Sequence, residues 1–292
     1  MIVQEAKDIF NKYGRKSVLT DDEEFVLLEA IKYLVEETGS TKWMIELGGY
    51  YYEQKKFDLA LKYYELADTY GDKWAPEGLG YIWYYGRTGV KDYDKAFHYY
   101  QKASENGYLK STIKLADMYK NGYSVEKNYD KYCEIIEQAY HMVKNARYLN
   151  EPLPEVFTRL ARIRVKQGKV QDAIGLYLGA KDFLIQRIMH NPFFGDLTSM
   201  KWLTEDLYDI VRFDRSDFDL YDLYVLLKEP VKVAFGYYGE EHTVESVKEE
   251  GGMAIKFDGK WYRDIDDFFL KATLDGERLP CLYNELTGFR VI

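Results

Sequence analysis

The side chains best suited to acid–base chemistry lie near the C-terminus, at His242, Asp264, Asp266 and Asp267. A pocket that joined the imidazole of His242 to the carboxylates of Asp266 and Asp267 could move protons in a hydrolysis. Asp264, however, directly precedes a predicted helix that starts at Ile265, where an aspartate commonly caps the helix. Because no nucleophile and base stand at a fixed spacing, a hydrolase is the least supported of the functions that we consider.

Other catalytic and metal-binding motifs are missing from the sequence. The four histidines are His98, His141, His190 and His242, and none stands in a metal-ligand motif such as HExxH. Cys133 and Cys281 are far apart and form no CxxC pair, which favours two reduced, buried thiols. There is no GxSxG, P-loop or GxGxxG motif. We therefore expect a protein that is not an enzyme and has no catalytic residue, metal or cofactor.

A stripe of aromatic side chains offers binding rather than catalysis. Trp74, Glu77, Tyr81 and Tyr84 follow a 3, 4, 3 spacing, which places them on one face of a helix. Two interpretations stay open. The rings could pack between neighbouring helix pairs, or they could line a groove for an extended peptide or helix, where tyrosine and tryptophan are frequent anchors.

Acidic residues gather in the last third of the chain. Residues 196–230 carry nine acids and four bases, and residues 231–292 carry twelve acids and eight bases. The acids of the first segment are Glu205, Asp206, Asp209, Asp214, Asp217, Asp219 and Asp222, together with Asp196 and Glu229. This pattern indicates either a solvated face with helix caps or a surface that docks on a basic partner.

The elements that must position these side chains are repeated. Residues 71–107 contain two amphipathic segments, predicted as helices over Ala75–Tyr85 and Asp92–Asn106, with Gly86 and Gly89 in the turn between them. Small and aromatic residues recur at 36-residue steps in three sets of positions. The sets are Ala60, Ala96 and Tyr132; Ala67, Ala103 and Ala139; and Phe57, Tyr93 and Tyr129. A fixed period of this length with two helices per unit predicts an α-solenoid.

The repeated unit resembles the Sel-one-like repeat (SLR), a relative of the tetratricopeptide repeat. The residues that carry the resemblance are Leu79, Gly80, Gly86, Gly89 and the run Asp92–Gly107. The segments Leu47–Gly71 and Leu160–Ala180 look more like plain tetratricopeptide repeats. The resemblance covers roughly residues 40–190, and it implies a right-handed solenoid in which the first helix of each pair lines the concave face.

That implied geometry extends the aromatic stripe to neighbouring repeats. The predicted groove residues are Tyr52, Glu53, Trp74, Glu77, Tyr81, Tyr84, Lys110, Asp117, Lys120, Arg162 and Lys166. Leu79 and Trp83 lie off the stripe and are expected to face the core of their own helix pair.

Patterns outside the clearest repeats predict the remaining elements. Helices are expected over Ile2–Tyr13, Asp21–Thr38, Val170–His190, Leu197–Val211 and Phe218–Lys228, with Thr20 and Glu23 as a capping box. A shift of 32 residues would align Leu28 with Ala60 and Val35 with Ala67. Residues 146–154 are expected to break the repeats. Residues 231–292 read as strands with a turn at Asp258-Gly259, two short helices over Ile265–Ala272 and Pro280–Leu286, and a last strand over Phe289–Ile292.

Composition and charge limit the compartment and the partners. The 292-residue chain has no apolar run near the roughly 20 residues of a membrane span, and no signal peptide is expected at its N-terminus. Its net charge is −9 without a basic stripe, which argues against nucleic acid and anionic membranes as partners. We expect a cytoplasmic protein whose partner is a protein or peptide.

The sequence therefore predicts a mainly α fold, an α-solenoid of helix-turn-helix repeats followed by a small α+β domain. We expect the solenoid over residues 1–195, an acidic helical junction over 196–230 and the α+β domain over 231–292. The first functional hypothesis is an adaptor or scaffold, of the kind found in bacteria, that binds a peptide or protein segment in its groove. The alternative is an acidic immunity or inhibitor protein that neutralises a basic partner through residues 196–292.

Overall fold

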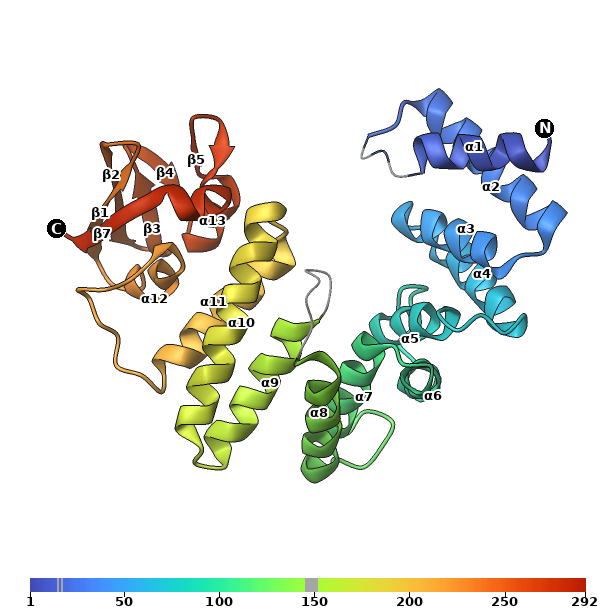
Figure 1. The fold of residues 1–292 in the computed structure, drawn as a ribbon, viewed down its shortest axis with the longest axis horizontal. Coiled ribbons are helices and arrows are strands. Elements are labelled where there is room, and N and C mark those ends of the chain that lie inside the picture. Colours follow the sequence, from blue (N-terminus) through green and yellow to red (C-terminus); the bar gives the residue numbers. More distant parts are fainter. Residues whose placement is uncertain (15, 17, 145–151) are drawn as a thin grey trace. The chain divides into compact units, whose positions relative to one another are not determined.

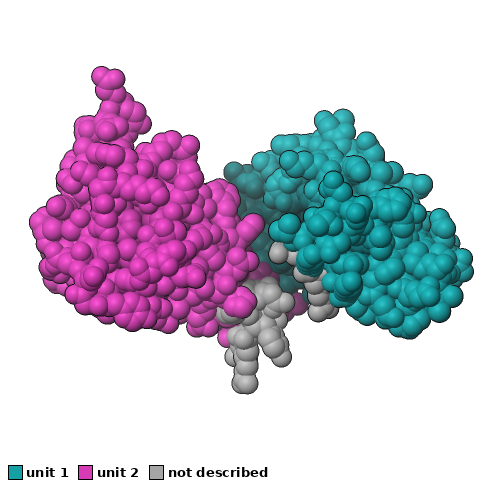
Figure 2. All heavy atoms as spheres, turned by 90° about the horizontal axis from the view of Figure 1, so that it is seen from above, with its two compact units in different colours: residues 1–135 teal, residues 136–292 magenta. Residues whose placement is uncertain are grey.

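The computed structural model describes residues 1–14, 16, 18–144 and 152–292. They form two compact units, Met1–Ile135 and Ile136–Ile292, which Figure 2 shows in different colours. Within the described residues, no helix combines the length and the apolar character that a membrane crossing requires. The predicted break at residues 146–154 lies largely outside the described residues, and the predicted boundaries at 195 and 230 stay predictions.

The first unit is built from antiparallel helix pairs (Figure 1). Its helices are α1 (Val3–Tyr13), α2 (Asp21–Thr38), α3 (Thr41–Glu53), α4 (Phe57–Thr69), α5 (Ala75–Tyr85), α6 (Tyr93–Glu105) and α7 (Leu109–Asn121), and α8 (Tyr129–Val143) begins in it. The predicted bounds of α2 and α5 are confirmed. The Thr20 hydroxyl accepts from the backbone N–H of Glu23, as the capping box requires, and Gly86 ends α5 at φ +62°, where a Cβ would meet Lys91 at 2.7 Å.

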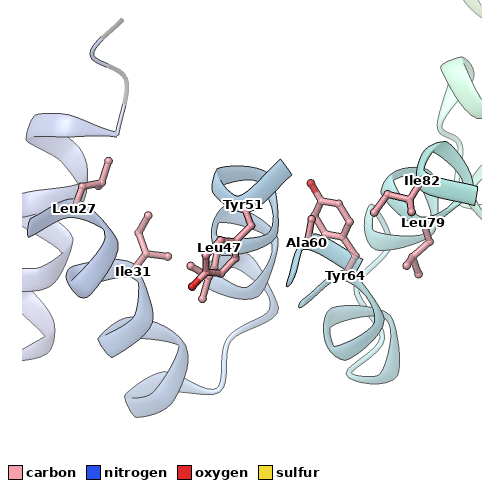
Figure 3. Close-up of a cluster of buried hydrophobic side chains, with 8 residues drawn as sticks. All are labelled: Leu27, Ile31, Leu47, Tyr51, Ala60, Tyr64, Leu79 and Ile82. Carbon is pink, nitrogen blue, oxygen red and sulfur yellow. The ribbon is translucent and has the colours of Figure 1, made fainter. Parts of the chain in front are cut away.

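The repeated apolar positions form the core of this unit. The alanines at 36-residue steps in this unit, Ala60, Ala96, Ala67 and Ala103, are fully buried, and so is Tyr132; Ala139, in the second unit, is fully buried as well. Figure 3 shows one cluster that runs from α2 through α3 and α4 to α5, with Leu27, Ile31, Leu47, Tyr51, Ala60, Tyr64, Leu79 and Ile82. Because consecutive helices share this cluster, each pair buries its apolar face against its neighbour.

Glycines on the first helix of a pair make room for a tyrosine on the second. A Cβ at Gly48 in α3 would lie 2.5 Å from the ring of Tyr64 in α4, and a Cβ at Gly78 in α5 would lie 3.0 Å from the same ring. Within the next pair, a Cβ at Gly80 in α5 would lie 2.6 Å from the ring of Tyr100 in α6. Tyr64 and Tyr100 are 36 residues apart and both buried, so the repeat unit includes this ring and its glycine neighbour.

One alignment of the first pair is wrong by one residue. The buried positions of α2 are Leu27, Ala30, Ile31 and Leu34, whereas the predicted counterparts of the alanines, Leu28 and Val35, are only half-buried. A shift of 33 residues instead pairs Leu27 with Ala60 and Leu34 with Ala67, which are all buried. Ala30 and Leu34 also share a cluster with Ala6 of α1.

The second unit opens with further helices. They are α9 (Leu153–Lys166), α10 (Val170–His190) and α11 (Phe194–Tyr208), followed by the 3-10 turn η1 (Leu220–Asp222) and the short α12 (Leu223–Leu226). The long α10 is continuous through Gly175 and Gly179, as predicted. The predicted helix over Phe218–Lys228 is shorter in the structure. It starts with the 3-10 turn η1, which Asp219 caps, and continues as α12 to Leu226.

The C-terminal part is an antiparallel sheet with short helices. Its strands are β1 (Val231–Tyr237), β2 (Glu240–Glu249), β3 (Gly252–Phe257), β4 (Lys260–Tyr262) and β7 (Leu286–Val291), in the order β4-β3-β2-β1-β7. Positive φ angles at Asp258 and Gly259 make the predicted two-residue hairpin turn. The helix α13 (Ile265–Lys271) is confirmed, and the segment predicted as a second helix is the 3-10 helix η2 (Leu279–Glu285).

Sequence reasoning missed one small hairpin. β5 (Thr273–Leu274) pairs with β6 (Glu277–Arg278) across Asp275 and Gly276, which both have positive φ. The Asp-Gly pair is the same turn signal that was used at Asp258-Gly259, so it could have found this hairpin.

The close approach of α3 and α4 can be tested at two adjacent glycines. Gly48→Ala would drive a methyl group into the ring of Tyr64, so we expect it to lower the free energy of unfolding by about 1–3 kcal/mol. Gly49 has only the Tyr64 hydroxyl at 3.8 Å, so Gly49→Ala should be neutral or stabilising by up to about 1 kcal/mol. Urea unfolding of both variants measures the difference, and equal effects would contradict the packing described.

Candidate functional site

Five of the predicted groove residues line one pocket in the first unit. We call it the aromatic pocket; it has a volume of about 290 Å³ and is lined by Gly49, Tyr52, Glu53, Tyr64, Trp74, Glu77, Gly78 and Tyr81. The lining comes from α3, α4, α5 and the residue that precedes α5. Pockets lined mostly by apolar and aromatic surface, with a few polar groups, are typical of ligand sites.

Trp74 is held at the start of α5. The carboxylate of Asp72 accepts from the backbone N–H groups of Trp74 and Ala75, at 2.8 and 3.0 Å. Edge contact with the ring of Tyr64, at 5.4 Å between centroids, fixes the indole against the second helix of the preceding pair. Tyr64, the buried ring beside Gly48 and Gly78, therefore positions Trp74, and the two rings form one wall of the aromatic pocket.

Tyr52 and Tyr81 form the opposite side of the aromatic pocket. Their rings meet edge to face at 5.9 Å. Arg87 lies beside both, with its guanidinium carbon 5.8 Å from the ring centre of Tyr52 and 5.5 Å from that of Tyr81, and it donates to the Tyr81 hydroxyl at 3.4 Å. The exposed Arg87 is thus surrounded by aromatic faces, as cation–π contacts favour.

The polar groups of the aromatic pocket are carboxylates. Glu77 accepts from the hydroxyl of Ser111 in α7 at 2.9 Å, which ties α5 to the next helix pair. Glu53 is exposed at the end of α3. Among the described residues that line this pocket, no side chain is basic.

A second pocket continues the first. We call it the N-terminal pocket; its volume is about 430 Å³, and it shares Gly49, Glu53, Tyr64 and Trp74 with the aromatic pocket. Its other described lining residues are Phe10, Tyr13, Gly14, Lys16, Leu19, Glu24, Leu27, Ile31, Ile45, Glu46, Tyr50 and Gln54. Glu24 accepts from the Tyr50 hydroxyl at 2.6 Å and so braces α2 against α3.

The fourth member of the aromatic stripe serves packing. Tyr84 does not line the aromatic pocket; its ring contacts those of Tyr93, Tyr100 and Tyr123 at 5.5–6.2 Å. Burial, together with nearby Asp117, raises the pKa of its hydroxyl to about 12. The stripe is therefore divided: Trp74, Glu77 and Tyr81 line a pocket, and Tyr84 packs between helices. That the pocket is a groove for a peptide stays a prediction.

The remaining predicted groove residues lie away from the aromatic pocket. In the first unit, Lys110 is exposed, Asp117 is half-buried, and the Lys120 amine lies 5.4 Å from the ring centre of Tyr132. In the second unit, Arg162 pairs with Asp206 at 2.6 Å, and Lys166 is exposed at the end of α9.

Sequence reasoning missed several residues of this region. The 4, 3 spacing of Lys110, Lys114 and Asp117 could have found Lys114, whose amine donates to the Tyr85 hydroxyl at 2.7 Å. Tyr64 was hidden because it belongs to the second helix of its pair, which the resemblance assigns to the outer layer. The N-terminal pocket residues Glu46 and Tyr50 precede Glu53 on α3 at spacings of 7 and 3, so the same face rule would have included them.

The candidate hydrolase residues are not brought together. Asp266 pairs with Lys201 at 2.8 Å, and Asp267 pairs with Lys271 at 2.5 Å. His242 lies 2.6 Å from Asp258 of the hairpin turn. Asp264 accepts from the backbone N–H of Asp267 and caps α13, as predicted.

Several acids of the junction are paired inside the second unit. The buried amine of Lys181 in α10 lies 2.8 Å from Asp219 and 2.7 Å from Asp222. Glu205 pairs with Lys228 at 2.8 Å. Asp214 accepts from the backbone and the hydroxyl of Ser216, as a turn residue does.

Comparison with solved structures identifies the fold. A Sel1 repeat protein from Oxalobacter formigenes matches over 78% of this chain and 86% of its own, at 16% identity and a TM-score of 0.54. A protective antigen of uropathogenic Escherichia coli with an SLR fold matches over 74% of this chain and 50% of its own, at 16% identity and a TM-score of 0.48. A tetratricopeptide repeat protein of Thermus thermophilus matches over 70% of this chain and 99% of its own, at 14% identity and a TM-score of 0.42.

The helix pairs and their shared core make this chain an α-solenoid with a C-terminal antiparallel sheet. In its fold it is an SLR/tetratricopeptide-like repeat protein, as the resemblance implies. No protein-family model matches the chain, and no curated protein matches its sequence.

The half-buried side chain of Tyr84 makes stability depend on alkaline pH. A tyrosine ionises near pH 10 in the unfolded chain, whereas Tyr84 ionises at about pH 12 in the folded protein. The contribution of Tyr84 to the free energy of unfolding is therefore complete below pH 10 and is lost as the pH rises through 12. Tyr84→Phe keeps the ring and removes the hydroxyl. We expect this variant to lose less unfolding free energy between pH 10 and 12 than the parent, by about 1 kcal/mol after allowance for partial exposure.

Urea unfolding at each pH, followed by near-ultraviolet circular dichroism, measures these losses. Tyr70 is 63% exposed, so Tyr70→Phe is the matched control and should lose as much as the parent. Equal losses in the parent and in Tyr84→Phe would contradict a packing role for Tyr84.

Proposed function

We propose that this chain is a non-enzymatic interaction protein, an adaptor or scaffold that binds a segment of a protein partner along the first unit. The observation that carries the proposal is the aromatic pocket, in which Tyr52, Trp74 and Tyr81 present ring surface next to two carboxylates. The N-terminal pocket, which adjoins it, supports the proposal by adding a second hollow along the same unit. The likeness to solenoids of the SLR type supports the architecture on which such a groove depends.

The alternative of an acidic inhibitor has less support. Asp206, Asp219 and Asp222 are engaged with Arg162 and Lys181, so part of the charge that would neutralise a basic partner is already compensated inside the second unit. The hydrolase hypothesis is weakened in the same way by the ion pairs of Asp266 and Asp267.

Binding by the aromatic pocket predicts a selective loss in the double variant Tyr52→Ala with Tyr81→Ala. Both rings line the pocket, so truncating them should weaken binding of a native partner at least roughly tenfold, as expected for aromatic anchors. The measurement is affinity capture from a native lysate with the full chain, followed by titration of the captured partner. The matched control is Tyr70→Ala, which removes an exposed ring outside the two pockets.

The thermal unfolding midpoint of each variant has to be measured beside its affinity. A partner that binds the folded double variant as tightly as the parent would contradict the groove assignment. A loss that also occurs with Tyr70→Ala would show that the effect does not come from the pocket.

A further inference from the structure

The two pockets of the first unit adjoin each other, and carboxylates outnumber basic side chains in their described lining. They share four lining residues, Gly49, Glu53, Tyr64 and Trp74, and therefore adjoin each other. Their described lining includes four carboxylates, Glu24, Glu46, Glu53 and Glu77. The basic side chain among these described residues, Lys16, is paired with Glu23 at 2.6 Å.

The aromatic faces beside these carboxylates already hold a cation of the chain itself. The guanidinium carbon of Arg87 lies 5.3–5.8 Å from the ring centres of Tyr52, Phe57, Tyr81 and Tyr85. Two of these rings, Tyr52 and Tyr81, also line the aromatic pocket. The chain therefore contains an internal example of the contact that an incoming arginine could make with the same cluster of rings.

We infer that the aromatic pocket selects an arginine-containing segment of its partner, with the guanidinium placed between the aromatic faces and the carboxylates of Glu53 and Glu77. This inference rests on the proposed function and adds the chemistry of the ligand. Glu77 keeps acceptor capacity beyond its bond from Ser111, because an ionised carboxylate has about four lone-pair sites. A planar guanidinium can stack on a ring and bond a carboxylate at once, which a lysine amine does less well.

The carboxylates of the aromatic pocket favour a cationic occupant over an acidic or a purely apolar one. Phosphate-bearing or acidic segments in the aromatic pocket would meet the carboxylates of Glu53 and Glu77, and like charges across an interface are costly. A purely apolar segment would partly desolvate the carboxylates of Glu53 and Glu77 without adding a hydrogen-bond donor, which is unfavourable.

A peptide selection on the full-length protein tests the inference. The probe is a displayed library of random 12-residue peptides without charge bias, and the selected sequences are then synthesised. We expect them to carry arginine. Replacing that arginine by citrulline, its neutral isostere, should weaken binding roughly tenfold, and binding should weaken further as salt is raised.

Two charge variants of the protein complete the test. The double variant Glu53→Gln with Glu77→Gln should bind the arginine peptides roughly tenfold more weakly, because two partly exposed charge contacts are removed. The matched control is Glu36→Gln with Glu65→Gln, which changes the net charge equally at exposed positions outside both pockets and should leave affinity unchanged.

The outcomes separate this inference from the proposed function. Selected peptides that are neutral or acidic, yet lose binding with Tyr52→Ala and Tyr81→Ala, would overturn the arginine preference and leave the groove in place. Arginine peptides that bind equally to the Glu53/Glu77 variant and the control variant would reduce the effect to net charge and overturn the inference. A library that yields no groove-dependent binder would contradict both.

Discussion

The fold depends on how closely the two helices of a pair can approach. Small residues at the contact, such as Gly48 beside Tyr64 and Gly80 beside Tyr100, let a tyrosine ring lie directly on the backbone of the facing helix. Ala60 and Ala96, also on the second helices of these pairs, are fully buried. Because interiors are close-packed, the large ring and the missing side chain require each other, and the repeat preserves both.

This packing rule also builds the candidate site. Tyr64 is buried by Gly48 and Gly78, and its edge contact with Trp74 sets one wall of the aromatic pocket. The same ring also lines the N-terminal pocket. The core and the candidate site of the first unit are therefore parts of one arrangement. Its carboxylates, Glu53 and Glu77, lie on α3 and α5, the two helices whose glycines contact the Tyr64 ring.

The sequence was informative wherever periodicity or a local cap determines structure. The 36-residue alanine steps predicted the buried core, and Thr20 with Glu23 predicted the start of α2. Periodicity could not separate Tyr81, which lines the pocket, from Tyr84, which packs against three other tyrosines, because both lie on one helical face. That distinction depends on Tyr93, Tyr100 and Tyr123, which lie on other segments and whose proximity only the folded chain determines.

The most direct measurement of the central claim is site-specific photo-crosslinking in the native cells. A benzophenone amino acid placed at Tyr52, inside the aromatic pocket, is compared with one at exposed Tyr70, and the crosslinked peptides are identified by mass spectrometry. The account predicts that position 52 captures a defined segment of a partner, while position 70 does not capture that segment. Crosslinks from both positions to the same segment, or none from position 52, would contradict it.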